Sequence, residues 1–526
     1  MTQVFLYDTT LRDGTQREDI SLSVDDKLVI AKRLADFGFR YIEGGWPGSN
    51  PKDAEFFARA AKLDLGDARL AAFGRTRQKT LKCEQDTNLK ALLDAGTPVV
   101  TMVGKSSAYH AELVLSATLE ENLAMIRDSV AYIKSHGREV MFDAEHFFDG
   151  FIDNREYTMA TLRAAAEAGV DWLVLCETNG GKLPWEVEEI VREVRKHLDT
   201  PLGVHCHNDT GCGISNTLSA VRGGCTQVQG TINGYGERVG NANLTTIIPN
   251  LQLKMGIPVV KPDQLRELTS LSHYVAEVVN LKHYNHAPYI GHSAFAHKGG
   301  IHVAAIMKAS DTYQHIDPAL VGNEMRSVVS ELSGRGNIQM QAKKLGIDLS
   351  NEDAQRVLNH IKHLEHEGFT FEAAEASVEL MMHCLRPDYV HPFELIDYFV
   401  ITERRHSRGL LSEATVKVKI GHEIKFVAAE GNGPINALSM ALHTALRDIY
   451  PALKTVHLTD YKVRILDSAS GTTAKIRVLA TFQGGGHVWT TVGASANVID
   501  ASWRAVSDSL EYALLKLEDS LACPLY

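Results

Sequence analysis

The sequence predicts an α/β protein that begins with a closed parallel (β/α)8 barrel and continues into helical linker subdomains and a C-terminal α+β domain. From the N-terminus to about residue 235, short apolar runs alternate with amphipathic helical patterns. Eight such strand-helix units match the length of a TIM barrel, about 250 residues. Polar residues also follow nearly every strand, whereas an open doubly wound sheet, the alternative, would concentrate its ligand site at one switch point.

The strands of the barrel are short apolar runs separated by helical patterns. The first helix begins after Ser23, a good N-cap residue, and ends at Gly38 in the usual C-terminal position. Later helices are expected at 158–168 and 185–198. The eight predicted strands are 4–7, 41–43, 70–73, 99–103, 140–142, 172–175, 202–204 and 228–232.

The alternation stops after Leu244, and the rest of the chain has a different organisation. We expect one helix at 262–281, and polar helical segments with glycine-rich breaks from 293 to about 392. Alternating strands and two helices then indicate a separate α+β domain. Its strands are expected at 415–420, 424–427, 462–466, 474–481 and 488–492, and its helices at 434–449 and 498–517. The predicted domains are 1–285, 286–395 and 396–526.

The composition excludes several classes of protein. A formal charge of −11 argues against nucleic acid as the main partner, because a phosphate-binding surface needs basic excess. The N-terminus shows no secretory signal, and no apolar run is long enough for a membrane span. Scattered cysteines without a CxxC pair indicate reduced thiols in the cytoplasm. They are Cys83, Cys176, Cys206, Cys212, Cys225, Cys384 and Cys523.

A His-x-His pair follows the seventh predicted strand. Residues two apart on a strand share a face, so His205 and His207 offer two imidazoles side by side, while Cys206 points into the core. Two unpaired imidazoles on an exposed strand would be unremarkable, but Val204 indicates a buried strand, where they are costly to desolvate. The pair therefore predicts half of a metal site.

Two further stretches offer the remaining ligands. Arg12 and Asp13 follow the first strand, at the end of the barrel where catalysis occurs; elsewhere such a pair would be a weak surface ion pair. The loop after strand eight, 233–241, combines three glycines with polar residues, and either Asn233 or Asn241 could supply an oxygen. Ligand type alone does not separate Mn²⁺, Zn²⁺, Mg²⁺ and Fe²⁺.

Three motifs in order, DTTLRDG at 8–14, His205-x-His207 and NGYGERVGN at 233–241, closely resemble the acyl-CoA-condensing, metal-dependent barrel enzymes. This family comprises the isopropylmalate, homocitrate and citramalate synthases. The resemblance covers the whole chain, because GNGP at 431–434 and the stretch 491–503 resemble the family's regulatory dimerisation domain. It implies a homodimer that uses acetyl-CoA and a 2-oxo acid.

The resemblance also implies roles for individual residues. Arg12 would polarise the ketone of the 2-oxo acid, and Asp143 and Thr178 would bind the substrate. Glu145 matches the acidic residue proposed as base, although a carboxylate that merely leads a helix is the alternative. The implied ligands of a divalent metal, Mn²⁺, Mg²⁺ or Zn²⁺, are Asp13, His205, His207 and Asn241.

Two residues of the linker match the family's residues that reach over the barrel from the neighbouring subunit. They are His302 and Tyr313, and His302 is the second candidate for the base. The family commonly has Gln-Asp-Gly after this histidine, whereas this chain has Val-Ala-Ala at 303–305. The departure removes the carboxylate that would partner His302.

The chemistry is consistent with these roles. Condensation of acetyl-CoA with a ketone requires removal of a weakly acidic methyl proton and stabilisation of the alkoxide that develops. A carboxylate or histidine can do the first, and a divalent cation with Arg12 can do the second. Neither a Schiff-base lysine nor a phosphate-binding P-loop is evident.

Within the family, the stretches 44–50, 101–106 and 145–150 look most like the citramalate synthases, which join pyruvate to acetyl-CoA on a route to isoleucine. Phe73, Met102 and Phe142 are candidates to fill a small substrate pocket, with barrel core as their alternative place. An isopropylmalate synthase is the nearest alternative function. A retro-Claisen lyase and a non-catalytic amino-acid-sensing paralogue are the others.

The C-terminal domain carries no predicted catalytic residue, and we therefore expect it to bind an amino-acid effector that inhibits the enzyme. Isoleucine is the expected effector if citramalate is the product. Truncation near residue 395 should then leave condensation and abolish inhibition.

Overall fold

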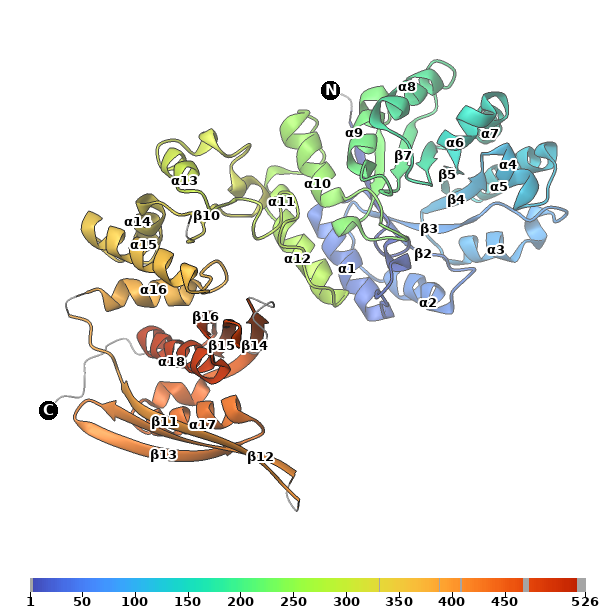
Figure 1. Cartoon of the computed structure of the whole chain (residues 1–526). Coiled ribbons are helices and arrows are strands. Elements are labelled where there is room, and N and C mark those ends of the chain that lie inside the picture. The colour runs from blue at the N-terminus through green and yellow to red at the C-terminus, as the bar shows by residue number, and fades with distance from the viewer. Residues whose placement is uncertain (1–2, 331, 387, 407–408, 467–472, 518–526) are drawn as a thin grey trace. The chain divides into compact units, whose positions relative to one another are not determined.

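The computed structural model describes residues 3–330, 332–386, 388–406, 409–466 and 473–517. The chain forms two compact units (Figure 1). The first comprises Met1–Phe295 and Ile316–Glu324, and the second comprises Ala296–His315 and Met325–Tyr526. The domain boundaries expected at 285 and 395 remain predictions.

The first unit is a closed barrel of eight parallel strands, as predicted. Each strand pairs with the next, and β1 pairs in parallel with β8, so the sheet has no edge and the open-sheet alternative is wrong. The strands are β1 Phe5–Asp8, β2 Tyr41–Gly45, β3 Arg69–Arg75, β4 Val99–Lys105, β5 Glu139–Glu145, β6 Trp172–Glu177, β7 Leu202–Cys206 and β8 Gln227–Gly230.

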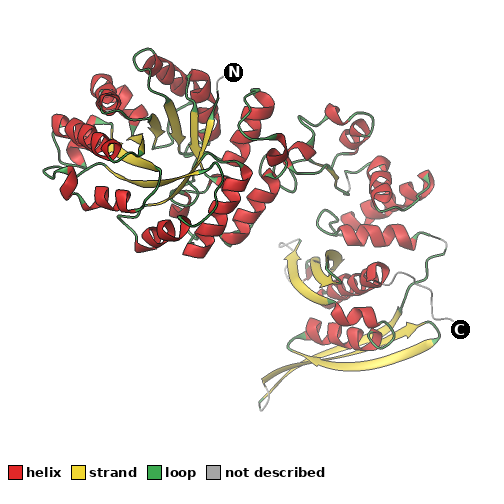
Figure 2. Cartoon of the chain, turned by 180° about the vertical axis from the view of Figure 1, so that it is seen from behind, coloured by secondary structure: helices red, strands yellow, loops and turns green. Residues whose placement is uncertain are grey.

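Helices surround the barrel (Figure 2). Ser23 and Asp26 form a capping box at the start of α1, and Gly38 ends it at φ +108°, which confirms both predicted boundaries. The helices are α1 Val24–Phe37, α2 Pro51–Ala60, α3 Thr87–Asp94, α4 Ala108–Leu113, α5 Leu119–Ser135, α6 Phe147–Asp153, α7 Arg155–Glu167, α8 Pro184–Arg195, α9 Gly213–Gly223 and α10 Leu244–Pro249.

The single helix expected at 262–281 is wrong: the segment forms α11 Pro262–Leu265 and α12 Leu268–Val278. The returning segment that contains Pro318–Val321 packs at the break between them. A Cβ atom on Gly322 would lie 2.0 Å from the Arg266 carbonyl oxygen. This close approach of a distant segment explains an interruption that the local pattern does not reveal.

The second unit begins with small helices and a short parallel pair, β9 Ala296–His297 and β10 Arg326–Ser327, and ends in two three-stranded antiparallel sheets. β11 was not predicted, because its apolar residues, such as Leu395, Ile396 and Phe399, do not alternate with polar ones. Its helices are α13 Gly300–Ile306, α14 Arg335–Lys344, α15 Asn351–His366, α16 Glu375–Cys384, α17 Pro434–Leu446 and α18 Val498–Leu517. The sheets are β11 Glu394–Arg405, β12 Gly409–Ile420 and β13 Glu423–Gly431, and β14 His457–Ile465, β15 Ile476–Gly484 and β16 His487–Ser495.

The linker helices and the last sheet share one hydrophobic core. Phe371 and Val378 belong to the same buried cluster as Val492 and Ala494 of β16. Truncation at residue 395 would therefore remove part of the core of the linker helices. A truncated chain consequently cannot separate loss of regulation from loss of folding.

Two sequence-based expectations concern the whole chain. Among the described residues, no helix is long and apolar enough to cross a membrane. The six described cysteines are unpaired thiols, and Cys206 lies in the core as expected. Cys523 lies outside the described residues.

Candidate active site

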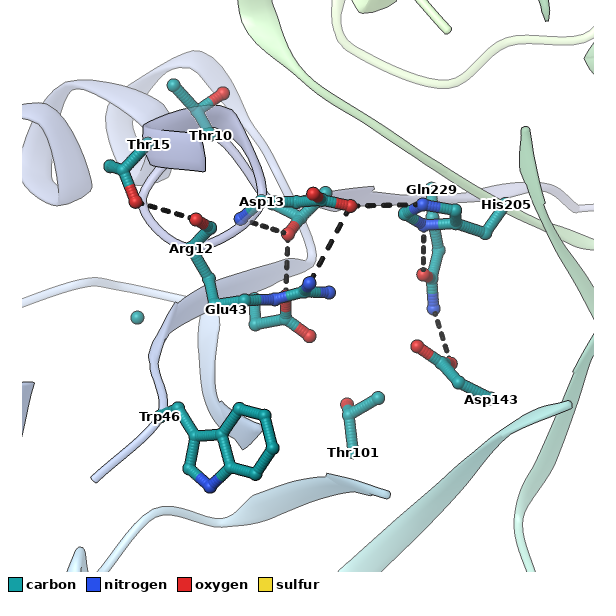
Figure 3. Close-up of polar contacts among 12 residues, drawn as sticks. Thr10, Arg12, Asp13, Thr15, Glu43, Trp46, Thr101, Asp143, His205 and Gln229 are labelled. Atoms are coloured by element: carbon teal, nitrogen blue, oxygen red, sulfur yellow. Dashed lines mark hydrogen bonds and ion pairs between the residues drawn. The ribbon is translucent and has the colours of Figure 1, made fainter. Parts of the chain in front are cut away.

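Asp13, His205 and His207 converge at the C-terminal end of the barrel (Figure 3). All three are buried, and the Nε2 atoms of His205 and His207 lie 3.2 and 3.9 Å from Asp13 Oδ2. Their ligand atoms all lie within 4.8 Å of one another, as a shared metal ion requires. Residues 192 positions apart in the chain, from 13 to 205, meet here because the barrel brings the strand ends into one ring.

His207 lies just beyond the strand on which it was expected. β7 ends at Cys206, and His207 instead forms an isolated antiparallel bridge with Asn241. The loop after β8 takes over the pairing at this point, because the Ala242 N–H donates to the Cys206 carbonyl at 2.8 Å. The bridge places the last asparagine of the third motif beside the second histidine.

Asn241 has an oxygen free for a cation, whereas Asn233 does not. Asn241 Oδ1 and Asp13 Oδ1 are buried without a hydrogen-bond partner, which is costly unless a ligand satisfies them. Asn241 Nδ2 donates to the Tyr235 carbonyl at 3.2 Å, which leaves the oxygen unused. Asn233 Oδ1 accepts from Ser272 Oγ at 2.5 Å. The geometry therefore supports Asn241 among the two oxygens that the sequence left open.

The glycines of this loop hold Asn241 in place. Gly240 adopts φ +98°, and a Cβ atom there would lie 1.9 Å from the Gly234 carbonyl oxygen. At Gly236, φ is +151° and a Cβ atom would lie 2.2 Å from Asn241 Nδ2. The glycine spacing is thus required by the close packing of the loop against its own asparagine.

Arg12 is held as a fixed cation beside the cluster. Its Nε donates to Glu43 Oε1 at 2.6 Å, and its Nη1 lies 3.6 Å from Asp13 Oδ2 (Figure 3). Its guanidinium carbon lies 3.8 Å from the centre of the Phe73 ring. Glu43, from β2, was not among the predicted site residues, although it also stands near the end of a barrel strand.

Two shifts in pKa follow from this arrangement. Burial alone would raise the pKa of Asp13, but Arg12 and the two histidines outweigh it and hold that pKa well below its usual range. Burial, with the charge of Glu43, raises the pKa of Asp143 to about 7. Asp13 is therefore ionised at neutral pH and ready to bind a cation.

A hydrogen-bonded chain orients His205 from behind. Its Nδ1 lies 3.0 Å from Gln229 Oε1, and Gln229 Nε2 lies 3.4 Å from Asp143 Oδ1 (Figure 3). Because the amide oxygen can only accept, Nδ1 carries the proton and Nε2 keeps its lone pair toward Asp13. This is the usual support of a metal-binding histidine. Asp143 thus lies next to the cluster, in the pocket described next.

A pocket of about 790 Å³ opens over the cluster. Glu145 forms an ion pair with Lys105, and Thr178 Oγ1 accepts the His146 N–H at 2.9 Å, which leaves the threonine proton free to donate. The predicted site residues on its wall are Arg12, Asp13, Asp143, Glu145, Thr178, His205 and His207.

Two of the three expected pocket-filling residues are elsewhere. Phe73 lines the pocket, but Met102 and Phe142 are fully buried in the core cluster between the strands and the helices. Successive side chains of a strand point to opposite faces, so these two face away from the barrel interior. Trp46 and Val103 line the pocket instead, and Trp46 packs edge-on against Phe73 at 5.4 Å.

His302 and Tyr313 belong to the second unit. His302 lies on α13, and its ring stacks on that of Tyr313 with the centroids 4.3 Å apart. The pairing shows that the two predicted residues act as one group. Their role in catalysis stays a prediction.

The closed barrel and its Asp-His-His cluster define the class of the protein, and comparison with known proteins agrees. Residues 3–275 match the HMGL-like family, residues 289–368 the homocitrate synthase post-HMGL domain-like family, and residues 372–514 the LeuA allosteric (dimerisation) domain. The chain is therefore an HMGL-like barrel followed by a LeuA-type domain.

Curated relatives resolve the family further. The chain is 51% identical to the (R)-citramalate synthase of Geobacter sulfurreducens over 99% of both chains. It is 48% identical to that of Aquifex aeolicus, over 98% of this chain and 99% of the relative. The 2-isopropylmalate synthase of Methanocaldococcus jannaschii is 32% identical, over 98% of this chain and 96% of the relative. The chain belongs to the (R)-citramalate synthase family.

Proposed function

We propose that the chain is an acyltransferase that condenses acetyl-CoA with pyruvate and releases (R)-citramalate and CoA. The observation that carries the proposal is the placement of Arg12 beside the buried Asp13–His205–His207 cluster, on the wall of one pocket. Five relatives that are 42–51% identical are (R)-citramalate synthases, which supports pyruvate as the oxo acid. The acyltransferase reading displaces both the lyase and the non-catalytic alternatives.

The residues present fit a divalent metal ion. Asp13, His205, His207 and Asn241 would hold it, because they combine an ionised carboxylate, two imidazoles and an unpartnered amide oxygen. When bound, the ion supplies a Lewis acid that polarises the ketone and orients the 2-oxo acid. The choice among Mn²⁺, Mg²⁺ and Zn²⁺ stays open.

The protein's own groups account for the remaining chemistry. Glu145 takes a proton from the acetyl methyl group, and the resulting carbanion attacks the ketone carbon of pyruvate to form the new carbon-carbon bond. Arg12, fixed by Glu43, stabilises the negative charge that develops on the ketone oxygen. Thr178 donates its free proton to the pyruvate carboxylate. Water then hydrolyses the thioester, which releases CoA and citramalate.

We expect pyruvate to be the fastest substrate in a panel of 2-oxo acids. Phe73 and Trp46 fill the pocket beside Arg12, and a branched side chain would have to displace them. Discrimination by a few methyl groups is worth about 1–3 kcal/mol each, or roughly 10- to 200-fold in kcat/KM. The measurement is acetyl-CoA-dependent thiol release. Faster turnover of 2-oxoisovalerate would move the function to 2-isopropylmalate synthesis, and no release with any acid would remove the synthase.

Four further features belong to the proposal. The match to a LeuA allosteric (dimerisation) domain supports a homodimer. Citramalate formation supports a place in isoleucine biosynthesis, within the synthesis of branched-chain amino acids. Unpaired cysteines support a cytoplasmic location. The substrates and the effector are small molecules, and neither nucleic acid nor membrane is a partner.

We expect isoleucine to inhibit the full-length enzyme more strongly than leucine or valine does. The C-terminal LeuA-type domain lies outside the barrel that carries the pocket, so an effector bound there acts at a distance. The measurement is initial rate at increasing concentrations of each amino acid, with pyruvate near its KM. The shared core makes the intact chain the proper material. Equal inhibition by all three, or none by isoleucine, contradicts the assignment of the effector.

A further inference from the structure

A second cluster of metal-ligating side chains lies in the second unit, far from the barrel in sequence. Cys384, His391 and Glu511 each offer a ligand atom, and these atoms all lie within 4.8 Å of one another. Glu511 is buried, Cys384 is partly buried and His391 is largely exposed. The scattered positions concealed this cluster from sequence analysis, because it has no short metal-binding motif.

Three separate segments build the cluster. Cys384 is the last residue of α16, His391 follows in the segment that leads into β11, and Glu511 lies on α18. α16 and α18 pack against each other (Figure 1). The arrangement is therefore a product of tertiary packing within this unit.

The surroundings attract a cation. Asp508 lies three residues before Glu511 on α18, so both carboxylates share a face of the helix. The C-terminal end of α16 adds the partial negative charge of its free carbonyl groups. In the described part of the chain, neither carboxylate forms an ion pair with a lysine or arginine. The basic residues of these segments pair elsewhere: Arg386 with Asp388, Arg504 with Asp500, and Lys516 with Glu379.

A cavity gives access to these groups. Its volume is about 280 Å³, and Cys384, His391, Asp508 and Glu511 all line it. His360 of α15 lines it as well. A hydrogen-bonded contact of 2.7 Å already joins His391 Nδ1 to Glu511 Oε1, and Tyr389 Oη donates to the same oxygen at 2.7 Å. The donors are thus held together with room beside them for an ion.

We propose that Cys384, His391 and Glu511 bind one thiophilic divalent cation of the Zn²⁺ type. A thiolate, an imidazole and a carboxylate are the ligands that Zn²⁺ takes in proteins, and Mg²⁺ avoids sulfur. Asp508, or water in the cavity, completes the coordination. The ion cross-links α16, the segment before β11 and α18, and so ties the linker helices to the C-terminal domain.

The thiol must lose its proton when the ion binds. Burial, together with Glu511 and Asp508, raises the pKa of the Cys384 thiol to about 12 in the metal-free protein. A bound cation reverses this effect, because it stabilises the thiolate directly. Binding therefore releases a proton and weakens as the pH falls.

The test uses untagged full-length protein that is stripped with a chelator and titrated with Co²⁺, with Zn²⁺ stoichiometry measured in parallel. A thiolate ligand produces a sulfur-to-cobalt charge-transfer band in the near ultraviolet. The ligands proposed for the barrel site, Asp13, His205, His207 and Asn241, include no sulfur. We expect the band in the wild type and in Asp13→Asn, and its loss in Cys384→Ser together with one Zn²⁺ equivalent.

Two more variants make the result decisive. Cys212→Ser is the matched control, because Cys212 is a partly buried thiol outside both clusters, and it should keep the band. His391→Ala changes a side chain that is 54% exposed, so folding should survive while Co²⁺ affinity falls at least 10-fold. A band that persists in Cys384→Ser, unchanged affinity in His391→Ala, or no band in the wild type would show a metal-free hydrogen-bonded cluster.

Discussion

Replacement of Asp13 by asparagine is expected to lower kcat by on the order of 10³-fold, because a bound cation supplies several kcal/mol of charge stabilisation and each 1.36 kcal/mol is tenfold in rate. Asp13 is the only carboxylate of the first cluster and lies between His205 and Arg12. The amide keeps the shape of the side chain but removes the charge. The variant should also retain less metal after dialysis.

Asp8→Asn is the matched control for this change. Asp8 stands in the same strand-to-loop segment, is equally buried, and accepts two hydrogen bonds from Thr10. Burial raises its pKa to about 7, so loss of its charge changes little at neutral pH. Metal content and kcat, measured together, should change in Asp13→Asn alone. An Asp13→Asn enzyme with full activity and full metal content would show that this residue is not a ligand.

Replacement of Glu145 by glutamine is expected to lower kcat by roughly 10²- to 10⁴-fold, the usual contribution of a positioned general base. Glu145 ends β5, faces the pocket and pairs with Lys105. Glutamine fills the same space but cannot accept the methyl proton. The direct measurement is exchange of the acetyl-CoA methyl hydrogens with deuterated water, which reports proton removal apart from condensation.

Asp149→Asn provides a closely matched control. Asp149 also follows β5, its side chain is 26% exposed like that of Glu145, and it pairs with Lys182 at 3.0 Å. This variant should keep the exchange rate within a few-fold. His302→Ala completes the set, because His302 is the other candidate for the base. If exchange survives in Glu145→Gln and is lost in His302→Ala, the role of base belongs to His302.

The barrel was predictable because its signals are local. Each strand is a short apolar run, and caps such as Ser23 and Gly38 mark the helix between two strands. Eight units of this kind close into one ring in only one common way. β11 escaped prediction because its apolar residues lack a period of two, and the break between α11 and α12 escaped because a distant segment causes it.

The candidate site shows the same division. Arg12, Asp13, His205 and His207 could be found because catalytic residues of a barrel follow its strands, and a short motif encodes each pair. Glu43 follows a strand too, but it stands alone in the sequence without a partner. Only the structure reveals that it holds Arg12 in place.

The sequence by itself determined the barrel, the order of the three motifs and the residue types that a divalent ion requires, because these depend on spacing along the chain. The tertiary structure decided which oxygen of the 233–241 loop is free, since Ser272 already satisfies Asn233. It also decided that Phe73, rather than Met102 or Phe142, faces the pocket. It alone brought Cys384, His391 and Glu511 together. These outcomes depend on which atoms remain unpartnered after packing, and spacing along a chain carries no record of that.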